Sequence, residues 1–347
     1  MYKLKQDIDF WVGVIGTAAS GTLNTLIEVT TAANVTQFGA VGGGTLVSAL
    51  NTLLKYGAKI IAVRVATGAD ATATAANIVG TDLNTGLGLL SRIEAQTSRY
   101  PIALVVPGIQ NDSVITALNT RAIEAGTLGI AGWLGTETDL NTARATAANY
   151  GLKSKNLAIT YPVLASASGT EYMTAHLAGL LVHQFKYGAL GVAPVGRKLR
   201  DIISTTPASS TAPATANGVI KARSLGNNQF DLAGYLNASA PTVTGQEALL
   251  VRIPVEGILT REIRAFLAGK IGLSINIHSA LLVEMEITNL LNNHAATGSI
   301  KHGYAKFNQQ ASTFPTDGSD VSLVYDICVS LVSGFVNSTS ITFTLVL

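Results

Sequence analysis

The chain has few charged residues, a single cysteine and no long hydrophobic run. Lys, Arg, Asp and Glu make up 13% of its 347 residues, about half the share that is usual in globular proteins. Cys328 has no second cysteine to pair with, and it lies in an apolar segment, which predicts a buried thiol. No apolar run reaches the roughly 18 residues that a membrane-spanning helix needs. A disulfide-stapled domain and a helical membrane protein are therefore not expected.

The charges that are present are balanced and scattered. The chain carries 23 basic and 21 acidic residues, a net charge of +2, with no block of like charge. Neither a nucleic acid nor a membrane is therefore an expected partner. A hydrophobic content of 48% is enough for a large core. A surface so poor in charge is more easily explained if other subunits cover much of it, so we expect a homo-oligomer.

The first half of the chain alternates strand-like and helix-like segments. Apolar runs predict strands at 10–16, 59–66, 101–108, 128–135 and 156–164. Helices are predicted at 45–57, 84–100, 111–126, 137–151 and 170–191. This order predicts an α/β domain with a mostly parallel sheet over residues 11–203.

The second half has a different organisation. Residues 204–218 are rich in Ser, Thr, Pro and Ala without an apolar period, which predicts a linker. Beyond them, residues 247–257 are strand-like, 260–298 contain helices and 320–334 are β-rich. We therefore expect an α+β domain over residues 219–335.

Extended arms are expected at both chain ends, over residues 1–10 and 336–347. The last segment, residues 340–347, alternates apolar and polar residues and has no strand after it to pair with. At the other end, Asp7 and Asp9 precede a very short apolar stretch, which disfavours a secretory signal. The terminal segment has the pattern of a strand that needs the edge of a sheet.

A glycine-rich turn follows the first predicted strand and raises the possibility of a phosphate site. The stretch GTAASGT, from Gly16 to Thr22, has the four-residue gap of a phosphate loop but lacks the lysine that would reach the phosphates. Neither it nor FGAVGGGT has the three glycines and the acidic residue of a dinucleotide site. We interpret both as tight turns, while a nucleotide- or small-molecule-binding α/β enzyme stays open as the alternative function.

No residues are nominated for catalysis, for a cofactor or for a metal. His176 and His183 are seven positions apart and can share a helix face, but no cysteine or carboxylate stands at ligand spacing beside them. No serine lies in a G-x-S-x-G turn. Glu284 and Glu286 alone do not make an acid/base pair. The chain is therefore not expected to be an enzyme.

Several segments, in order, resemble the contractile tail sheath proteins of bacteriophages and related injection devices. The opening VGVIGTAASGTLNTLIEVTTAANVTQFG is similar to the start of that family, and LVSALNTLLKYGAKIIAVRVAT to its next helix, glycine turn and "vvRV" strand, here with Gly57 and Arg64. GTDLNTGLGLLSRIEAQTSRYPIALVVPG resembles the stretch that closes on Pro-Gly, here Pro107 and Gly108. NLAITYP and LAGLLVHQFKYGALGVAPVGRKLRDI complete a likeness over residues 11–203.

The resemblance implies a structural role. Sheath subunits form hexameric rings that stack helically around an inner tube, and the contraction of this lattice ejects the tube. It implies baseplate and tail terminator proteins as further partners, assembly in a host or producer cytoplasm, and a final place in a virion tail or injection particle. A tube or baseplate component of the same device is a further alternative, although the long βα series disfavours a tube protein.

The resemblance also implies which residues make contacts between subunits. Terminal arms of sheath proteins add strands to a neighbour's sheet, which nominates Ile341, Phe343 and Leu345 at one end and Tyr2, Leu4 and Ile8 at the other.

A basic stretch in the second half has two interpretations. Arg261, Arg264 and Lys270 offer positive charge beside an apolar stripe on a predicted helix. They form either a solvated face or a contact to the inner tube.

Overall fold

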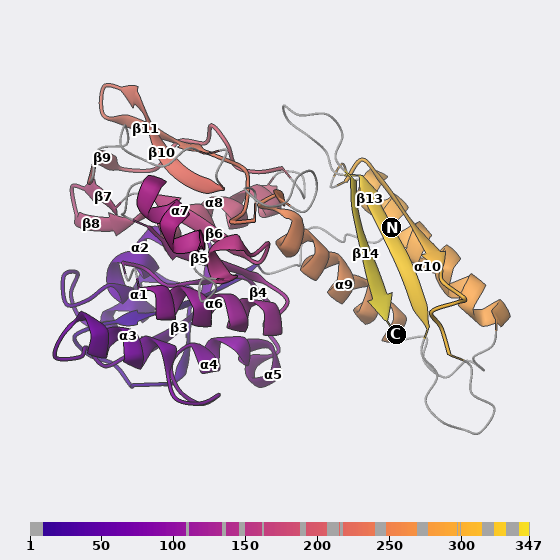
Figure 1. Cartoon of the computed structure of the whole chain (residues 1–347), viewed down its shortest axis with the longest axis horizontal. Helices are drawn as coiled ribbons and strands as arrows, with labels where there is room; N and C mark the ends of the chain where they lie inside the picture. Colours follow the sequence, from indigo (N-terminus) through magenta and orange to yellow (C-terminus); the bar gives the residue numbers. More distant parts are fainter. Residues whose placement is uncertain are drawn as a thin grey trace. The chain divides into compact units, whose positions relative to one another are not determined.

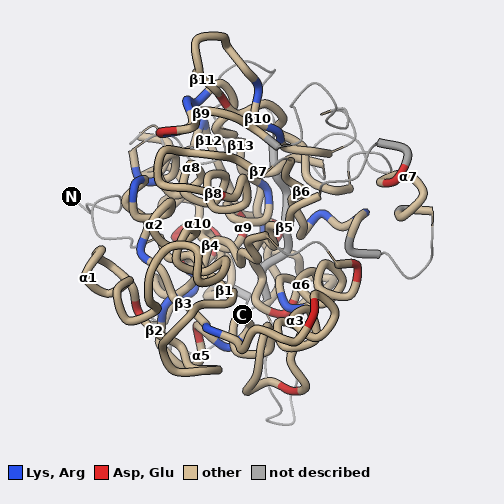
Figure 2. Tube along the Cα trace, turned by 90° about the vertical axis from the view of Figure 1, so that its left-hand side faces the viewer, with Lys and Arg blue, Asp and Glu red and all other residues tan. Residues whose placement is uncertain are grey.

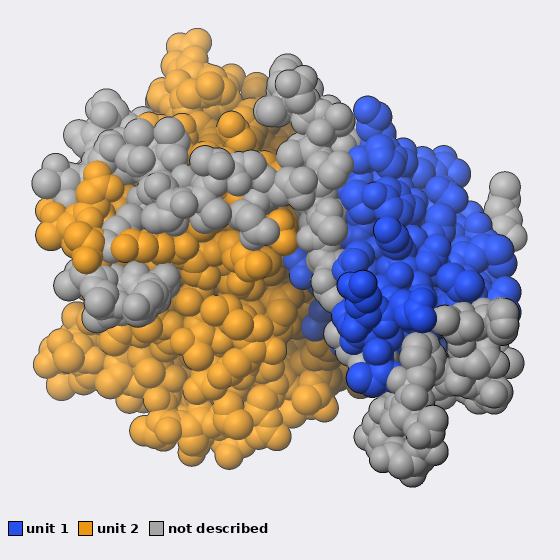
Figure 3. Space-filling view, turned by 45° about the vertical axis from the view of Figure 1, so that its right-hand side comes forward, with its two compact units in different colours: residues 1–6, 187–192, 255–347 blue, residues 7–186, 193–254 orange. Residues whose placement is uncertain are grey.

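The structure, a computed structural model, divides the chain into two compact units. The large unit comprises residues 7–186 and 193–254, and the small unit residues 1–6, 187–192 and 255–347 (Figure 3). The described residues are 10–108, 111–133, 137–145, 150–161, 163–187, 192–206, 215, 218–239, 248–268, 277–296, 298, 300–313, 323–330 and, for the backbone alone, 340–346.

The described part of the large unit is built on an eight-stranded sheet with the order β11-β10-β6-β5-β4-β1-β3-β2 (Figure 1). The inner strands are parallel, and the two edge strands β2 and β11 are antiparallel to their neighbours. The strands are β1 (Trp11–Thr17), β2 (Leu26–Val29), β3 (Lys59–Val65), β4 (Pro101–Val105), β5 (Leu128–Gly132), β6 (Leu157–Tyr161), β10 (Val219–Gly226) and β11 (Gln229–Ala233). The mostly parallel sheet predicted from the sequence is confirmed.

Helices cover both faces of this sheet because its strands are apolar on both faces. All of β1 is buried, as is typical of an inner parallel strand. The space beside Gly13 is taken by Ile93 on one face, and the space beside Gly16 by Leu46 on the other. The helices are α1 (Ala32–Val35), α2 (Leu46–Lys55), α3 (Ala71–Val79), α4 (Leu87–Ser91), α5 (Ile93–Thr97), α6 (Asp112–Glu124), α7 (Glu137–Ala145) and α8 (Met173–Tyr187).

A second, antiparallel sheet belongs to the same unit. Its order is β8-β7-β9, from β7 (Val163–Ser166), β8 (Gly169–Tyr172) and β9 (Ile202–Thr206). The helix predicted at 170–191 therefore begins only at Met173, after a strand that the sequence analysis did not find. Helix α8 is almost wholly buried, which explains why its sequence has no polar face.

The small unit combines two helices with a three-stranded antiparallel sheet. Its elements are α9 (Arg252–Ala268), which begins in the large unit, α10 (Ile277–Ala296), β12 (His302–Phe307), β13 (Val324–Ser330) and β14 (Ser340–Val346). Strand β12 alternates between exposed and buried residues, so one face of this sheet packs on α10. The hydroxyl of Tyr325 on β13 donates to the carbonyl of Ala280 on α10 at 3.1 Å. The α+β character expected for the second half is confirmed.

The terminal strand lies within its own chain. Strand β14 pairs with β13 over seven positions, so that Ile341, Phe343 and Leu345 stand opposite Val329, Ile327 and Tyr325. Those three β13 residues are buried. This arrangement differs from the expected unpaired arm. Among the described residues, β14 has a partner on one side only.

Two other expectations differ from the structure. The strand predicted at 247–257 is wrong, because helix α9 starts at Arg252. The expected boundary at 204–218 is also not where the compact units divide: β10 pairs with β6 of the large sheet, so residues up to 254 stay in the large unit. The second difference arises because local sequence does not encode which sheet a distant strand will join.

Replacing Ile327 with alanine should destabilise the small unit by about 2 to 5 kcal/mol, because Ile327 is fully buried on its central strand. Thermal unfolding followed by circular dichroism measures the change. Tyr304→Ala is the matched control, since Tyr304 lies on the neighbouring strand and is exposed. Equal shifts for both variants would contradict the assigned burial of this sheet.

Candidate functional site: a filled crevice and a buried polar cluster

The glycine-rich turn after β1 is closed by the protein itself. The backbone N–H of Thr17 donates to Oγ1 of Thr45 at 3.4 Å, and the N–H of Thr45 donates to Oγ1 of Thr17 at 3.3 Å. Gly44 has φ of +151°, and a Cβ there would lie 2.2 Å from the carbonyl oxygen of Thr17. The amides at the start of α2 that could hold a phosphate thus face the end of β1, so this is a structural turn.

Arg64 of the "vvRV" strand holds the same turn from the side. Its Nε donates to the carbonyl of Ala18 at 2.9 Å and its Nη1 to the carbonyl of Gly21 at 2.7 Å. The guanidinium therefore donates hydrogen bonds to carbonyl oxygens of the turn. Arginine suits this role because it carries several N–H donors in a fixed geometry.

The position where this class of sheet binds ligands is filled by Tyr172. The parallel strands run in the order β3-β1-β4-β5-β6, which reverses direction between β1 and β4, and ligands bind outside the carboxyl ends of such strands. Beyond the end of β4, a Cβ on Gly108 would lie 2.5 Å from Cε1 of Tyr172 and 3.0 Å from Cγ2 of Thr45. Burial raises the pKa of Tyr172. The crevice is thus packed with the protein's own side chains.

A buried carboxylate lies directly beside this tyrosine. Glu171 is 3% exposed; its Oε1 accepts from Nζ of Lys55 at 2.7 Å and its Oε2 accepts from Oγ1 of Thr52 at 3.2 Å. Oε2 also lies 2.7 Å from Nε2 of His176. Burial acts to raise the pKa of Glu171, but the hydrogen bonds from His176 and Lys55 outweigh it and lower the pKa to about 2.

The hydrogen bonds fix the protonation of His176, which is fully buried. An ionised carboxylate only accepts, so Nε2 of His176 carries the proton that Glu171 receives. Burial lowers the pKa of His176 against the effect of that hydrogen bond, so the ring is neutral. Its Nδ1 then accepts from the hydroxyl of Tyr56 at 2.8 Å. The Tyr56 oxygen in turn accepts the backbone N–H of Arg200 at 3.2 Å.

The Glu171 cluster consists of Thr52, Lys55, Tyr56, Glu171, His176 and Arg200. It joins α2, β8, α8 and the segment before β9, and the Arg200 guanidinium adds a bond to the carbonyl of Lys55 and lies 5.2 Å over the Tyr56 ring. A Glu–His–Tyr chain is a familiar acid/base arrangement. Here Tyr56 is 3% exposed and burial raises its pKa to about 12. The cluster therefore lies in the packed interior, where its hydrogen bonds hold α2, β8, α8 and the segment before β9 together.

The sequence does not predict this cluster. Tyr56 and Glu171 are not singled out there, and His176 enters only as a metal ligand that lacks partners at ligand spacing. The one local signal is a carboxylate just before an apolar helix; its partners on α2 lie more than a hundred residues earlier in the chain. Among the described residues, no group of three or more His, Cys, Asp and Glu side chains can hold a metal ion.

Comparisons with known proteins identify the fold of this chain. No protein-family model matches the sequence, and no curated protein matches it. Solved structures do match. The sheath tail protein from Desulfitobacterium hafniense matches 98% of this chain and 97% of its own, with 11% identity and a TM-score of 0.64. The chain has the tail sheath fold.

Two assemblies contain chains with the same fold. A chain of the anti-feeding prophage baseplate matches 93% of this chain and 89% of its own, with 13% identity and a TM-score of 0.68. A chain of the contracted PVC sheath complex, from an extracellular contractile injection system, matches 92% and 88%, with 12% identity and a TM-score of 0.64. The sheath fold therefore spans both units of this chain.

The residues that the sequence nominated for contacts lie in three places. Arg261 and Arg264 are one helical turn apart on α9, where Arg264 is exposed and Arg261 donates to the carbonyl of Gly257 at 3.2 Å. Ile341, Phe343 and Leu345 lie on β14. Lys270, Tyr2, Leu4 and Ile8 lie outside the described residues.

None of the helices in the described part of the chain is both long enough and apolar enough to span a bilayer.

The stability of the large unit should fall as the pH drops from 6.5 towards 2. In the unfolded chain, His176 and Glu171 take up protons near their ordinary pKa values of 6.5 and 4.5. In the folded cluster both pKa values are lowered, so each residue takes up its proton only at a lower pH. The unfolded state then binds more protons, which favours unfolding. For Glu171 the loss amounts to about 3 kcal/mol. Urea unfolding at a series of pH values measures it.

The variant Glu171→Gln should flatten this dependence between pH 4.5 and 2. Glu124→Gln is the control, since Glu124 is exposed and paired with Arg121 on the same helix turn. A Glu171→Gln protein with the pH dependence of the parent would show that the cluster does not control acid stability.

Proposed function

We propose that this protein is the structural subunit of a contractile tail sheath. In this proposal it polymerises as stacked hexameric rings around an inner tail tube, and contraction of the lattice drives the tube outward. The single observation that carries the proposal is the sheath fold, which extends over 98% of this chain and 97% of the sheath tail protein from Desulfitobacterium hafniense. The matching baseplate structure is described as six-fold symmetrised, which supports the ring.

The physical chemistry of the chain supports the same conclusion. Only 13% of its residues are charged, and in the view of Figure 2 the basic and acidic residues are scattered along a mostly uncharged trace. Large hydrophobic side chains such as Leu281, Leu282 and Met285 on α10 are exposed. Contacts with neighbouring copies would cover such surfaces. The filled crevice beside Tyr172 argues against a ligand at the carboxyl end of the large sheet, where an α/β enzyme of this topology would bind it.

Strand exchange through the terminal arms is the proposed joint between copies. Strand β14 forms one edge of its sheet among the described residues, and its ladder with β13 consists of backbone hydrogen bonds that a neighbour's strand can make equally well. Exchange of an identical element between copies needs no new contact. The strand that carries Ile341, Phe343 and Leu345 would pair with the sheet of a neighbouring copy. The second arm would be the segment with Tyr2, Leu4 and Ile8.

The energy for contraction would come from contacts between copies. If the contracted lattice adds about one to a few kcal/mol of contact per subunit, as a modest added interface does, the polymer performs mechanical work without a nucleotide. The further partners in this proposal are the inner tube protein, the baseplate and the tail terminator. Assembly would occur in a host or producer cytoplasm, before the sheath enters a virion tail or injection particle.

A Thr342→Cys variant tests the strand exchange, because Thr342 stands opposite Cys328 in the β13–β14 ladder. Opposed residues there have Cα atoms roughly 4.5 to 5.5 Å apart, a separation that a disulfide spans. Oxidising the variant before assembly should lock β14 onto its own sheet and prevent polymerisation. Oxidising it after assembly should join chains covalently. Electron microscopy and non-reducing electrophoresis measure the two results.

Thr344→Cys is the control, since its partner in the ladder is Asp326. An oxidised monomer that still forms normal tubes would contradict strand exchange through β14 but not the sheath proposal. A wild-type protein that stays monomeric even in the presence of its tube protein would contradict the sheath proposal itself.

Reversing the charge of Arg264 should weaken attachment to the inner tube by about 1 kcal/mol, or roughly fivefold in affinity, if α9 faces an acidic stripe there. Co-sedimentation of sheath and tube at low salt measures the binding. Lys306→Glu is the matched control, because Lys306 is an exposed lysine on β12 of the same unit. Equal binding by Arg264→Glu, Lys306→Glu and the parent would remove α9 as the tube contact.

A further inference from the structure

A short basic segment lies on the surface of the large unit, between α8 and β9. Arg197, Lys198 and Arg200 occupy three of four consecutive positions there, and all three are exposed. The N–H of Leu199, which lies between them, donates to the carbonyl of Phe230 on β11 at 2.9 Å, so the backbone of the segment is fixed to the large sheet. We call Arg197, Lys198 and Arg200 the basic ridge.

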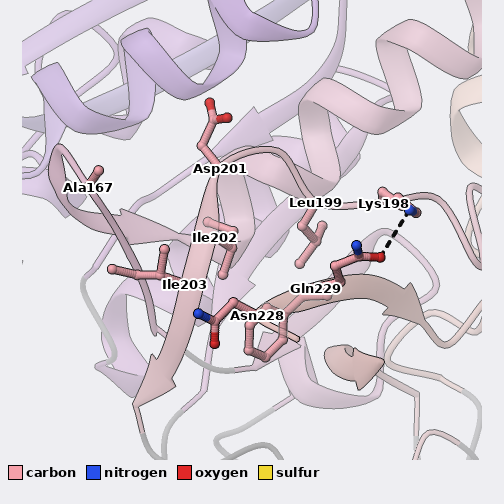
Figure 4. Close-up of a pocket in the computed structure, with 9 residues that line it drawn as sticks. Ala167, Lys198, Leu199, Asp201, Ile202, Ile203, Asn228 and Gln229 are labelled. Atoms are coloured by element: carbon pink, nitrogen blue, oxygen red, sulfur yellow. Dashed lines mark hydrogen bonds between the residues drawn. The ribbon is translucent and has the colours of Figure 1, made fainter. Parts of the chain in front are cut away.

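Uncharged acceptors hold two side chains of the basic ridge in place. Nη2 of Arg197 donates to Oε1 of Gln184 on α8 at 3.1 Å. Nζ of Lys198 donates to Oε1 of Gln229 on β11 at 3.0 Å (Figure 4). An amide oxygen accepts a hydrogen bond without neutralising the charge of the donor. Both cations are therefore ordered before a partner binds, which lowers the entropy cost of binding.

The third cation of the basic ridge is held in the same way. Arg200 donates to the backbone carbonyl of Lys55 and lies over the ring of Tyr56. The neighbouring carboxylate, Asp201, lies 3.3 Å from Nζ of Lys55, and Figure 4 shows its side chain directed away from Lys198. Among the described residues, no ion pair includes a member of the basic ridge. The ridge therefore presents positive charge that no described carboxylate pairs with.

His183 on α8 reports the positive potential around the ridge. Burial lowers the pKa of His183, and the charges of Arg200 and Arg197 lower it further. A positive neighbour disfavours a second positive charge on the imidazole ring. The ring is therefore mostly neutral near pH 7, and the surface around it favours an anionic partner.

Three exposed aspartates mark the starts of helices in the same unit. Asp70 caps α3, Asp112 is the first residue of α6, and Asp139 lies in the first turn of α7. These helices follow β3, β4 and β5, which run parallel to one another in the large sheet. Their starts therefore lie along one edge of the sheet, where the strands end. We call Asp70, Asp112 and Asp139 the acidic rim.

The basic ridge and the acidic rim lie on opposite faces of the large sheet. Helices α3, α6 and α7 share a core cluster with Ile93 of α5, which covers the face beside Gly13. The ridge is bonded to α2 and α8, and Leu46 of α2 covers the other face, beside Gly16. In Figure 2, α2 accordingly lies to the left and α3, α6 and α7 lie to the right. The two surfaces of one chain therefore face away from each other.

We propose that the basic ridge of one copy binds the acidic rim of a second copy. The rim supplies carboxylates, with which arginine and lysine form charge-assisted hydrogen bonds. Because the complementary surfaces lie on opposite faces, the contact is heterologous and repeats from copy to copy, as a ring or a helix requires. The inference rests on the proposed sheath function and adds to it a contact between large units. It needs neither the arms nor the small unit.

Reversing one charge of the ridge tests the contact. Lys198→Glu should raise the protein concentration needed for assembly about fivefold at low salt, because an attraction across the interface becomes a repulsion. Lys306→Glu is the matched control, since Lys306 is an exposed lysine of the small unit. Light scattering measures assembly, and thermal unfolding shows that each variant is folded. An unchanged assembly concentration for Lys198→Glu would contradict the contact.

A second reversal identifies the partner surface. Lys198→Glu is combined in turn with Asp70→Lys, Asp112→Lys and Asp139→Lys. The combination that reverses the carboxylate opposite Lys198 should restore assembly, because opposite charges then meet again. That rim variant alone should assemble as poorly as Lys198→Glu. Rescue by none of the three combinations would contradict the acidic rim as the partner.

A zero-length cross-link tests the contact in the unaltered protein. A carbodiimide joins a lysine amine to a carboxylate only where the two groups touch, and Lys198 is the lysine of the ridge. The protein is assembled from equal amounts of ¹⁴N and ¹⁵N chains, and mass spectrometry should find Lys198 joined to a rim aspartate of the other isotope. Cross-links of Lys198 within single chains only, or only to an added tube protein, would overturn the proposal.

The outcomes keep the two proposals apart. If the wild type forms tubes, but Lys198 is neither sensitive to charge reversal nor cross-linked to the rim, the ridge contact is wrong and the sheath proposal stands. If the wild type does not assemble at all, the sheath proposal fails, and this inference fails with it.

Discussion

The ionised carboxylate of Glu171 is the constraint on which the large unit depends. A charge buried this deeply is tolerated only when partners surround it, and here they come from α2 and α8. Because each partner must stand within hydrogen-bond distance, the positions of those helices and of β8 are fixed together. The same network continues through Tyr56 to Arg200, so the path of the chain into β9 follows from it as well.

This network also explains why the crevice at the carboxyl end of the large sheet is filled. Tyr172 is next in sequence to Glu171, so the bonds that hold the carboxylate place the tyrosine ring against Gly108 at the carboxyl end of the sheet. Sheets of this topology bind nucleotides in many proteins, but the fold alone does not determine the function. In this chain, the position that others leave open carries an aromatic side chain, and the turn after β1 is closed by two threonines.

What the fold leaves available are strand edges and uncharged surface. Strands β9 and β14 each have a described partner on one side only, and a charged fraction of 13% offers few residues to keep other chains away. In a monomer such edges are a liability. In the proposed polymer they would become joints, because a strand of a neighbouring copy supplies the missing backbone hydrogen bonds. The proposed function of the arms rests on this one property.

The sequence by itself determined the local elements and their class. The run at residues 101–108 is apolar throughout, which is typical of a strand buried in a parallel sheet. The absence of a lysine after Gly21 argued against a phosphate site before any contact was known. The order of strand-like and helix-like segments was enough to predict the α/β class, and the order of short motifs over residues 11–203 carried the resemblance to sheath proteins.

Only the tertiary structure decided which distant residues meet. The pairing of β10 with β6, the return of β14 to β13 and the contact of Glu171 with Lys55 each join segments that local propensity treats as independent. Such contacts form because burial brings the segments together, and a buried charge or an open edge then selects its partner by geometry. That selection acts across the whole chain, and no window of neighbouring residues contains it.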